Sequence, residues 1–131
     1  MSTAQLETLD TGLALLPEQE TWVAALNAGA RREAIAHCLR VDIHGEPDVP
    51  RLQQALDSLL ARHAALAMRL GSVAGYHGQR QFMPEASAQA FDLQVQPDVA
   101  PEAWLAEPWP AAGPYVQALL SRVTQGRWVL V

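Results

Sequence analysis

The sequence predicts an α+β domain in which a long helix packs across one face of a mixed or antiparallel sheet. Two periodicities lead to this prediction. Apolar residues recur every three or four positions in 48–70, which is typical of an amphipathic helix. Apolar residues alternate with polar ones in 31–44 and 91–95, and strand-like apolar runs fill 115–131, which is typical of strands with a buried face. No internal repeat interrupts this pattern, so we expect one folding unit.

The composition excludes several classes of protein. The chain has 131 residues, of which 50% are hydrophobic and 18% are charged, which suits one globular domain or part of a larger one. The net charge of −5 argues against non-specific binding to nucleic acid and gives no support to docking on anionic lipid. The single cysteine, Cys38, excludes an intrachain disulfide. Because no signal peptide or membrane-spanning run is visible, we expect a cytoplasmic protein with no membrane partner.

The first third of the chain predicts a lead-in, a helix and a strand. Residues 1–12 are polar and unpatterned, so we expect a flexible lead-in. The short apolar run 13–16 is expected to form a brief strand. Pro17 then begins a helix with an acidic first turn, and Gly29 ends it. The alternation in 31–44 predicts one continuous strand with a core-facing side.

The helix expected at 48–70 is the longest regular pattern in the chain. Asp48 is expected to cap its N-terminus, Pro50 lies in its first turn, and Gly71 is expected to end it. One set of residues shares an apolar face: Val49, Leu52, Leu56, Leu59, Leu60, His63, Leu66 and Leu70. A second set falls mostly on the outward face: Arg51, Gln54, Asp57, Ser58, Ala61 and Arg62.

The remaining elements are short. We expect, in order, a hairpin from 68 to 83 around the turn 75–78, a loop at 84–89, a strand at 91–95, a short helix at 101–106, and a hairpin formed by 115–124 and 127–131.

The titratable residues do not form a recognisable catalytic or metal-binding set. His63 could serve at a site if it were buried beside a charge, but no nucleophile lies nearby in the sequence. We therefore favour a structural role, in which the ring packs and bonds a backbone carbonyl. The spacing of His37, Cys38, His44 and His77 also gives no pair of ligands on one helical face. We predict no catalytic residue, no metal and no bound cofactor.

Three further features have two interpretations each. Cys38 could be a nucleophile, although a lone cysteine in a strand is usually inert packing. Tyr76-His77, between two glycines, is expected to form an exposed hairpin tip rather than a binding loop. Trp104 and Trp109 lie among prolines and either form an apolar docking surface or cover an edge of the core, with the second favoured.

One stretch resembles a known family. Residues 62–70, Arg-His-Ala-Ala-Leu-Ala-Met-Arg-Leu, are similar to the Arg-His-Glu-x-Leu-Arg-Thr-x-Phe motif of condensation domains from nonribosomal peptide synthetases. Arg62, His63 and Leu66 match this motif, whereas Ala67 replaces its second arginine. The order of elements from about 13 to 131 also resembles the N-terminal part of that domain. The family's first motif, Ser-x-Ala-Gln-x-Arg, is reduced to Gln19.

The resemblance implies a chloramphenicol acetyltransferase-like half domain covering 13–131. In the family, a strand like the one at 127–131 leads into the catalytic motif His-His-x-x-x-Asp-Gly, which the sequence does not contain. The full-length parent would join acyl groups held on carrier proteins, whose phosphopantetheine is the only cofactor implied. The 131 residues alone are therefore expected to be inactive. Arg62, His63 and Leu66 are implied to be structural, supporting the missing motif.

The implied partners follow from this incomplete domain. They are the remainder of the domain or a second chain that completes the sheet, and carrier proteins. A homodimer through an exposed sheet edge is another arrangement. The alternative function is a self-contained or degenerate interaction module that binds a carrier protein or a tailoring partner.

Overall fold

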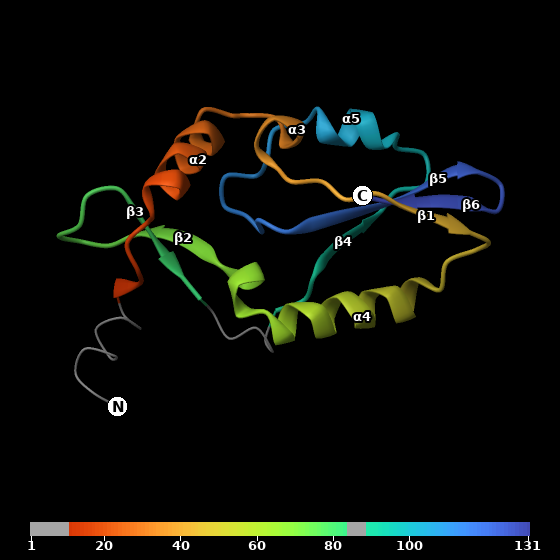
Figure 1. The fold of residues 1–131 in the computed structure, drawn as a ribbon, viewed down its shortest axis with the longest axis horizontal. Helices are drawn as coiled ribbons and strands as arrows, with labels where there is room; N and C mark the ends of the chain where they lie inside the picture. The colour runs from red at the N-terminus through yellow and green to blue at the C-terminus, as the bar shows by residue number, and fades with distance from the viewer. Residues whose placement is uncertain (1–10, 84–88) are drawn as a thin grey trace.

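The computed structural model of the protein describes residues 11–83 and 89–131 (Figure 1). Most of the expected lead-in and of the expected loop at 84–89 lies outside the described residues. The elements, in chain order, are α2 (Pro17–Asn27), α3 (Arg32–Ile35), β1 (Val41–His44), α4 (Val49–Arg62), the 3-10 helix η1 (Ala64–Ala67), β2 (Arg69–Ser72), β3 (Gln79–Phe82), β4 (Asp92–Val95), α5 (Pro101–Leu105), β5 (Gln117–Thr124) and β6 (Arg127–Leu130). None of the described helices is long and apolar enough to cross a membrane.

The main sheet has four strands in the order β1-β6-β5-β4. β4 runs parallel to β5, whereas β5–β6 and β6–β1 are antiparallel, so the sheet is mixed, as predicted. β5 and β6 form the expected hairpin at 115–131, and Val129 in β6 is fully buried. The hairpin expected at 68–83 also forms, as the separate two-stranded sheet β2–β3.

Helices cover both faces of the main sheet (Figure 1). On one face, α4 contributes Leu60 to a buried cluster with Ala67, Phe91 and Ala118. On the opposite face lies α5, whose Trp104 indole nitrogen donates to Gln94 Oε1 of β4 at 3.1 Å. Because successive residues of a strand point to opposite faces, β5 supplies both layers. The partly buried residues packed against the Leu60 cluster are Leu56, Leu66, Leu93, Val116 and Leu130.

The long helix begins where the sequence predicted and ends earlier. Asp48 caps it, because its carboxylate accepts the backbone N–H of Arg51 at 3.1 Å. The prediction that the helix reaches Leu70 is wrong, since α4 ends at Arg62. A 3-10 turn follows, in which the N–H of Leu66 donates to the carbonyl of His63 at 2.9 Å. The three-residue repeat of that turn keeps Leu66 against the core, which explains why the apolar pattern continues past the helix.

Gly71 does not end the helix as predicted, because it lies inside β2 and pairs with Arg80 of β3. The alanine-rich stretch before it has high helix propensity, but that preference amounts to only a few tenths of a kcal/mol per residue. Ladder hydrogen bonds to β3 and burial of Ala67, which is 1% exposed, outweigh it.

The continuous strand predicted for 31–44 is also wrong. Arg31 forms a single bridge with Pro108, the next residues turn into the short helix α3, and only Val41–His44 forms a strand, paired with β6. Arg32 explains the turn, because its side chain is buried and bonds groups on α5 and β5. Leu39 is 85% exposed and Val41 52%, whereas Ile35 and Ile43 are half-buried, so the alternation does not mark one continuous core-facing side.

The brief strand expected at 13–16 is reduced to one bridge. Leu13 and Gln81 exchange two backbone hydrogen bonds of 2.8 and 2.9 Å. Gly12 precedes this bridge with φ of 68°, and an added Cβ there would lie 2.6 Å from the carbonyl oxygen of Gln81. The next helix, α2, begins at Pro17 as predicted, and Gly29 follows its end with φ of 79°.

Two polar side chains of α4 hold the start of β4. Asp57 Oδ1 accepts the backbone N–H of Phe91 at 2.8 Å, and Gln53 Nε2 donates to the carbonyl of Phe91 at 2.9 Å. Gln53 Nε2 also donates to Asp57 Oδ1 at 2.9 Å, so the two side chains support each other. The prediction that Asp57 lies on the outward face is wrong, because Asp57 is half-buried between α4 and β4.

Candidate functional site

The three residues of the Arg-His-x-x-Leu motif do not meet at one site. Arg62 and His63 have exposed side chains at the end of α4, and Leu66 packs against the Leu60 cluster. The prediction that the ring of His63 packs against the protein is therefore wrong. The proposed supporting role of these residues toward a following motif stays a prediction.

Gln19, the residue kept from the family's first motif, lies in a polar cluster that the sequence did not reveal. Its Oε1 accepts the backbone N–H of Leu16 at 2.8 Å, which caps α2. Its amide also exchanges hydrogen bonds of 3.1 Å with the amide of Gln81. Gln81 is buried, and its Nε2 further donates to the carbonyl of Ala14 at 2.9 Å. This amide pair ties α2 to the β2–β3 hairpin.

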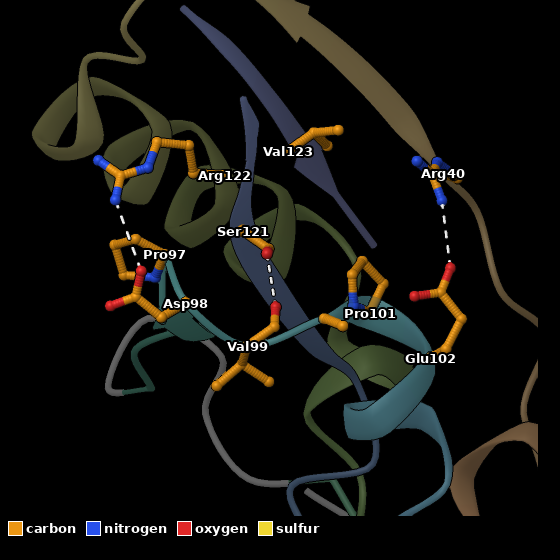
Figure 2. A pocket seen from close by; sticks show the side chains of 10 residues that line it. Arg40, Pro97, Asp98, Val99, Pro101, Glu102, Ser121, Arg122 and Val123 are labelled. Atoms are coloured by element: carbon orange, nitrogen blue, oxygen red, sulfur yellow. Dashed lines mark hydrogen bonds and ion pairs between the residues drawn. The ribbon is translucent and has the colours of Figure 1, made fainter. Parts of the chain in front are cut away.

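An open groove of about 510 Å³ lies between the loop before α5 and strand β5 (Figure 2). Two ion pairs cross it, one between Arg122 and Asp98 at 3.5 Å and one between Arg40 and Glu102 at 3.8 Å. Between them, the hydroxyl of Ser121 donates to the carbonyl of Val99.

The groove contains no arrangement suited to proton transfer or covalent catalysis. The Ser121 hydroxyl is committed to a backbone carbonyl, and no histidine among the described residues lines the groove to activate it. The two arginines lie opposite carboxylates at the rim, and exposed pairs of this kind contribute about 0–1 kcal/mol each. The charged side chains of the groove are thus already matched with one another.

A second cavity, of about 540 Å³, lies between α2 and the segment 109–116, and it has an aromatic lining. The rings of Trp22 and Tyr115 meet edge to face with centroids 5.3 Å apart. Each polar aromatic atom bonds a backbone carbonyl: Trp22 Nε1 that of Ile35, Trp109 Nε1 that of Pro114, and the Tyr115 hydroxyl that of Ala111. The rings therefore offer the cavity mainly their apolar surfaces. We call this the aromatic cavity.

Burial raises the pKa of the Tyr115 phenol above its usual value of 10.0, and the charge of Arg69 acts in the opposite direction. Tyr115 is therefore a neutral hydroxyl at physiological pH.

A smaller cavity of about 190 Å³ adjoins the aromatic cavity and contains Arg32. The two cavities share Ala36, His37, Trp109 and Val116 in their walls. Trp104 is 4% exposed, so it covers an edge of the core, which was the favoured interpretation, and Trp109 is half-buried.

The histidines and the cysteine lie apart. His37 and Cys38 are exposed in the coil after α3 rather than on opposite faces of a strand. Tyr76 and His77 are exposed at the tip of the β2–β3 hairpin, as predicted. Within residues 11–83 and 89–131, no group of three or more His, Cys, Asp or Glu side chains is placed to hold a metal ion.

Comparisons with known proteins show which solved structures share this fold. No protein-family model matches the sequence, and no curated protein matches it. Solved structures do match. A variant of the starter condensation domain of rhizomide synthetase RzmA, in complex with C8-CoA, gives a TM-score of 0.64 at 17% identity over 98% of the chain. A second variant, in complex with C8-CoA and Leu-SNAC, gives 0.63 at 17% identity over 99%.

The chain spans 32% of the length of each of these proteins. A third RzmA structure, in a "product-released" conformation, gives a TM-score of 0.62 at 18% identity with the same 32% span. The predicted fold class is confirmed by these matches. The chain has the chloramphenicol acetyltransferase-like fold of a condensation domain, over about a third of that domain.

Proposed function

We propose that this chain is the N-terminal subdomain of a condensation domain of the nonribosomal peptide synthetase type. The parent would form an amide bond between acyl groups held on two carrier proteins through phosphopantetheine. The observation that supports the proposal is a fold match over nearly the whole chain, with a TM-score of 0.64. The Arg62-His63-x-x-Leu66 resemblance supports it independently, because it comes from the sequence alone.

The position of β6 also fits this function. In the resembled family, the catalytic His-His-x-x-x-Asp-Gly motif follows a strand like Arg127–Leu130. Here β6 lies between β1 and β5, and its Trp128 and Val129 are buried. Residues that follow an interior strand start from a well-defined position and direction, because both neighbouring strands restrain the backbone of that strand.

The proposed partners are the rest of the condensation domain and carrier proteins in the cytoplasm. In the described part of the main sheet, β1 and β4 are the edge strands. Their free backbone groups offer a place for a further strand, from the rest of the domain or from another chain.

The experiment is reconstitution of the parent. The open reading frame that contains this chain is expressed in full, together with donor and acceptor carrier proteins loaded with acyl groups. Amide product on the acceptor carrier is followed by intact-protein mass spectrometry. We expect product with the full-length parent and none with the 131 residues alone.

A matched variant separates chemistry from folding. Replacing the second histidine of a His-His-x-x-x-Asp-Gly motif found after Val131 should abolish product while the protein stays folded. A full reading frame without that motif, or product that survives the histidine replacement, would contradict the proposal. If the frame lacks the motif and the chain still binds a carrier or tailoring protein in a pull-down with purified components, the interaction-module alternative is supported instead.

A further inference from the structure

We propose that the cavity at Arg32 is a binding site for a small carboxylate with an apolar body. This inference does not depend on the proposed condensation activity. It starts from Arg32, which is 4% exposed, although arginine is almost never fully buried unless it is paired.

The guanidinium is held in one orientation by three acceptors. Its Nε donates to Gln117 Oε1 at 3.1 Å, and its Nη1 donates to the carbonyl of Trp104 at 3.0 Å and to Glu107 Oε2 at 3.2 Å. The plane also lies over the Trp104 ring, 4.5 Å from its centroid, and 6.0 Å from the centroid of Trp109. Such a fixed guanidinium loses little conformational entropy when it binds a ligand.

One end of the guanidinium has no partner. Nη2 donates to no side chain or carbonyl among the described residues. Trp128 Nε1 is the only fully enclosed side-chain nitrogen or oxygen without a partner in that part of the chain, so Nη2 keeps some accessible surface. Arg32 lines the cavity of about 190 Å³, and Nη2 is the nitrogen of its guanidinium that is left to donate to a ligand there.

The chemistry of the cavity selects the ligand. The wall is otherwise mostly apolar, with Leu39, Leu105, Trp109 and Val116 among its residues. An apolar cavity with one fixed, charged donor suits a ligand that has an apolar body and a single anionic group. A carboxylate oxygen can accept an Nη2 proton, and a charge-assisted bond of this kind is about twice as strong as a neutral one.

The carboxylate of Glu107 partly neutralises the positive charge of the Arg32 guanidinium. Its carboxylate shares Nη1, but its side chain is 61% exposed, so solvent weakens its effect on the guanidinium. Because a negative charge beside the guanidinium still opposes an incoming anion, removing the charge of Glu107 should strengthen anion binding. This gives a test that leaves the buried arginine in place.

Benzoate is a suitable probe, with benzamide as its neutral isostere and inorganic phosphate as an anion without an apolar body. The 131-residue protein is titrated with each compound, and the indole N–H signals of its four tryptophans are followed by two-dimensional NMR. We expect saturable shifts of the Trp104 and Trp109 signals with benzoate, and binding weaker by about tenfold or more with benzamide and with phosphate.

Two variants test the residue assignment. Glu107→Gln should bind benzoate at least about twofold more tightly, because a competing negative charge is gone. Arg32→Gln should bind it about tenfold or more weakly, once circular dichroism shows that the variant is folded. Unchanged or weaker binding by Glu107→Gln would overturn the proposal even if Arg32→Gln fails to fold. No saturable shift with benzoate, or equal binding of benzoate and benzamide, would also overturn it.

Discussion

The contact between α4 and β4 leads to a quantitative prediction about Asp57. Its carboxylate accepts the backbone N–H of Phe91 at 2.8 Å and the side-chain amide of Gln53 at 2.9 Å. Phe91 belongs to the buried cluster under α4, so this hydrogen bond fixes the position at which β4 enters the core. We expect Asp57→Ala to destabilise the protein, although the sequence pattern places residue 57 on the outward face.

The magnitude follows from two opposing contributions. Leaving the partly buried N–H of Phe91 without its acceptor costs about 1–3 kcal/mol. Alanine is a better helix former than aspartate, which offsets about 0.5 kcal/mol. Gln53 keeps its bond to the carbonyl of Phe91, so the rest of the contact survives. The free energy of unfolding should fall by about 0.5–2.5 kcal/mol.

Urea unfolding followed by far-ultraviolet circular dichroism measures this change. Gln54→Ala is the matched control, because Gln54 is exposed on the same helix and its side chain makes no hydrogen bond to the described residues. The control should leave the free energy of unfolding within about 0.5 kcal/mol of the parent value. Asp57→Asn, which keeps an acceptor oxygen, should lie between the two. Equal stability of Asp57→Ala and Gln54→Ala would refute the reasoning.

Three further predictions address the core, a backbone position and a titrating group. Leu60→Ala should lower the free energy of unfolding by about 2–4 kcal/mol, because Leu60 is only 4% exposed. Leu59 is 43% exposed, so Leu59→Ala should lower it by less than about 1 kcal/mol. Similar losses for the two variants in urea unfolding would contradict the placement of α4. Gly12→Ala should destabilise the protein more than Gly29→Ala, since both have positive φ but only Gly12 would meet a backbone oxygen at 2.6 Å; thermal unfolding compares the two. The raised pKa of Tyr115 means that its phenol loses its proton first in the unfolded state, so stability should fall as pH rises above about 10 toward the folded-state pKa. Tyr115→Phe should reduce that fall in urea unfolding at alkaline pH, and an unchanged pH dependence would contradict it.

The elements that the sequence predicted well are those with strong local signals. Pro17 begins α2, Asp48 caps α4, and the turn at Gly126 joins β5 and β6, each as expected. These signals work because a fixed φ, a capping carboxylate or a positive φ acts over only a few residues.

The errors arose where distant contacts outweighed a local pattern. The alternation in 31–44 indicated one strand, but the bonds of Arg32 to Trp104 and Gln117 hold the chain in a turn. Apolar spacing predicts a helix up to Leu70, but α4 ends at Arg62, and residues from Arg69 onward pair with β3 instead. Periodicity cannot reveal such partners, because they lie far away in the sequence.

The candidate sites were even less visible in the sequence. The Arg32 cavity is built from three segments that no spacing rule connects, at 32–39, 104–117 and 131. The Gln19–Gln81 amide pair likewise joins residues from distant elements. What the sequence did provide was the resemblance at Arg62, His63 and Leu66, which indicated the fold rather than a site.

The pairing of β1 with β6 has a consequence for how the protein forms during translation. His44 lies opposite Arg127, so the sheet joins two segments that are far apart in the sequence. β1 emerges from the ribosome long before its partner, and α4 emerges before β5 and β6, which form the sheet that it covers. Until Arg127–Leu130 has been made, the exposed Val41 and the apolar face of α4 remain without their native contacts. Such long-range pairing makes folding slow, and the nascent chain is vulnerable to aggregation throughout that interval.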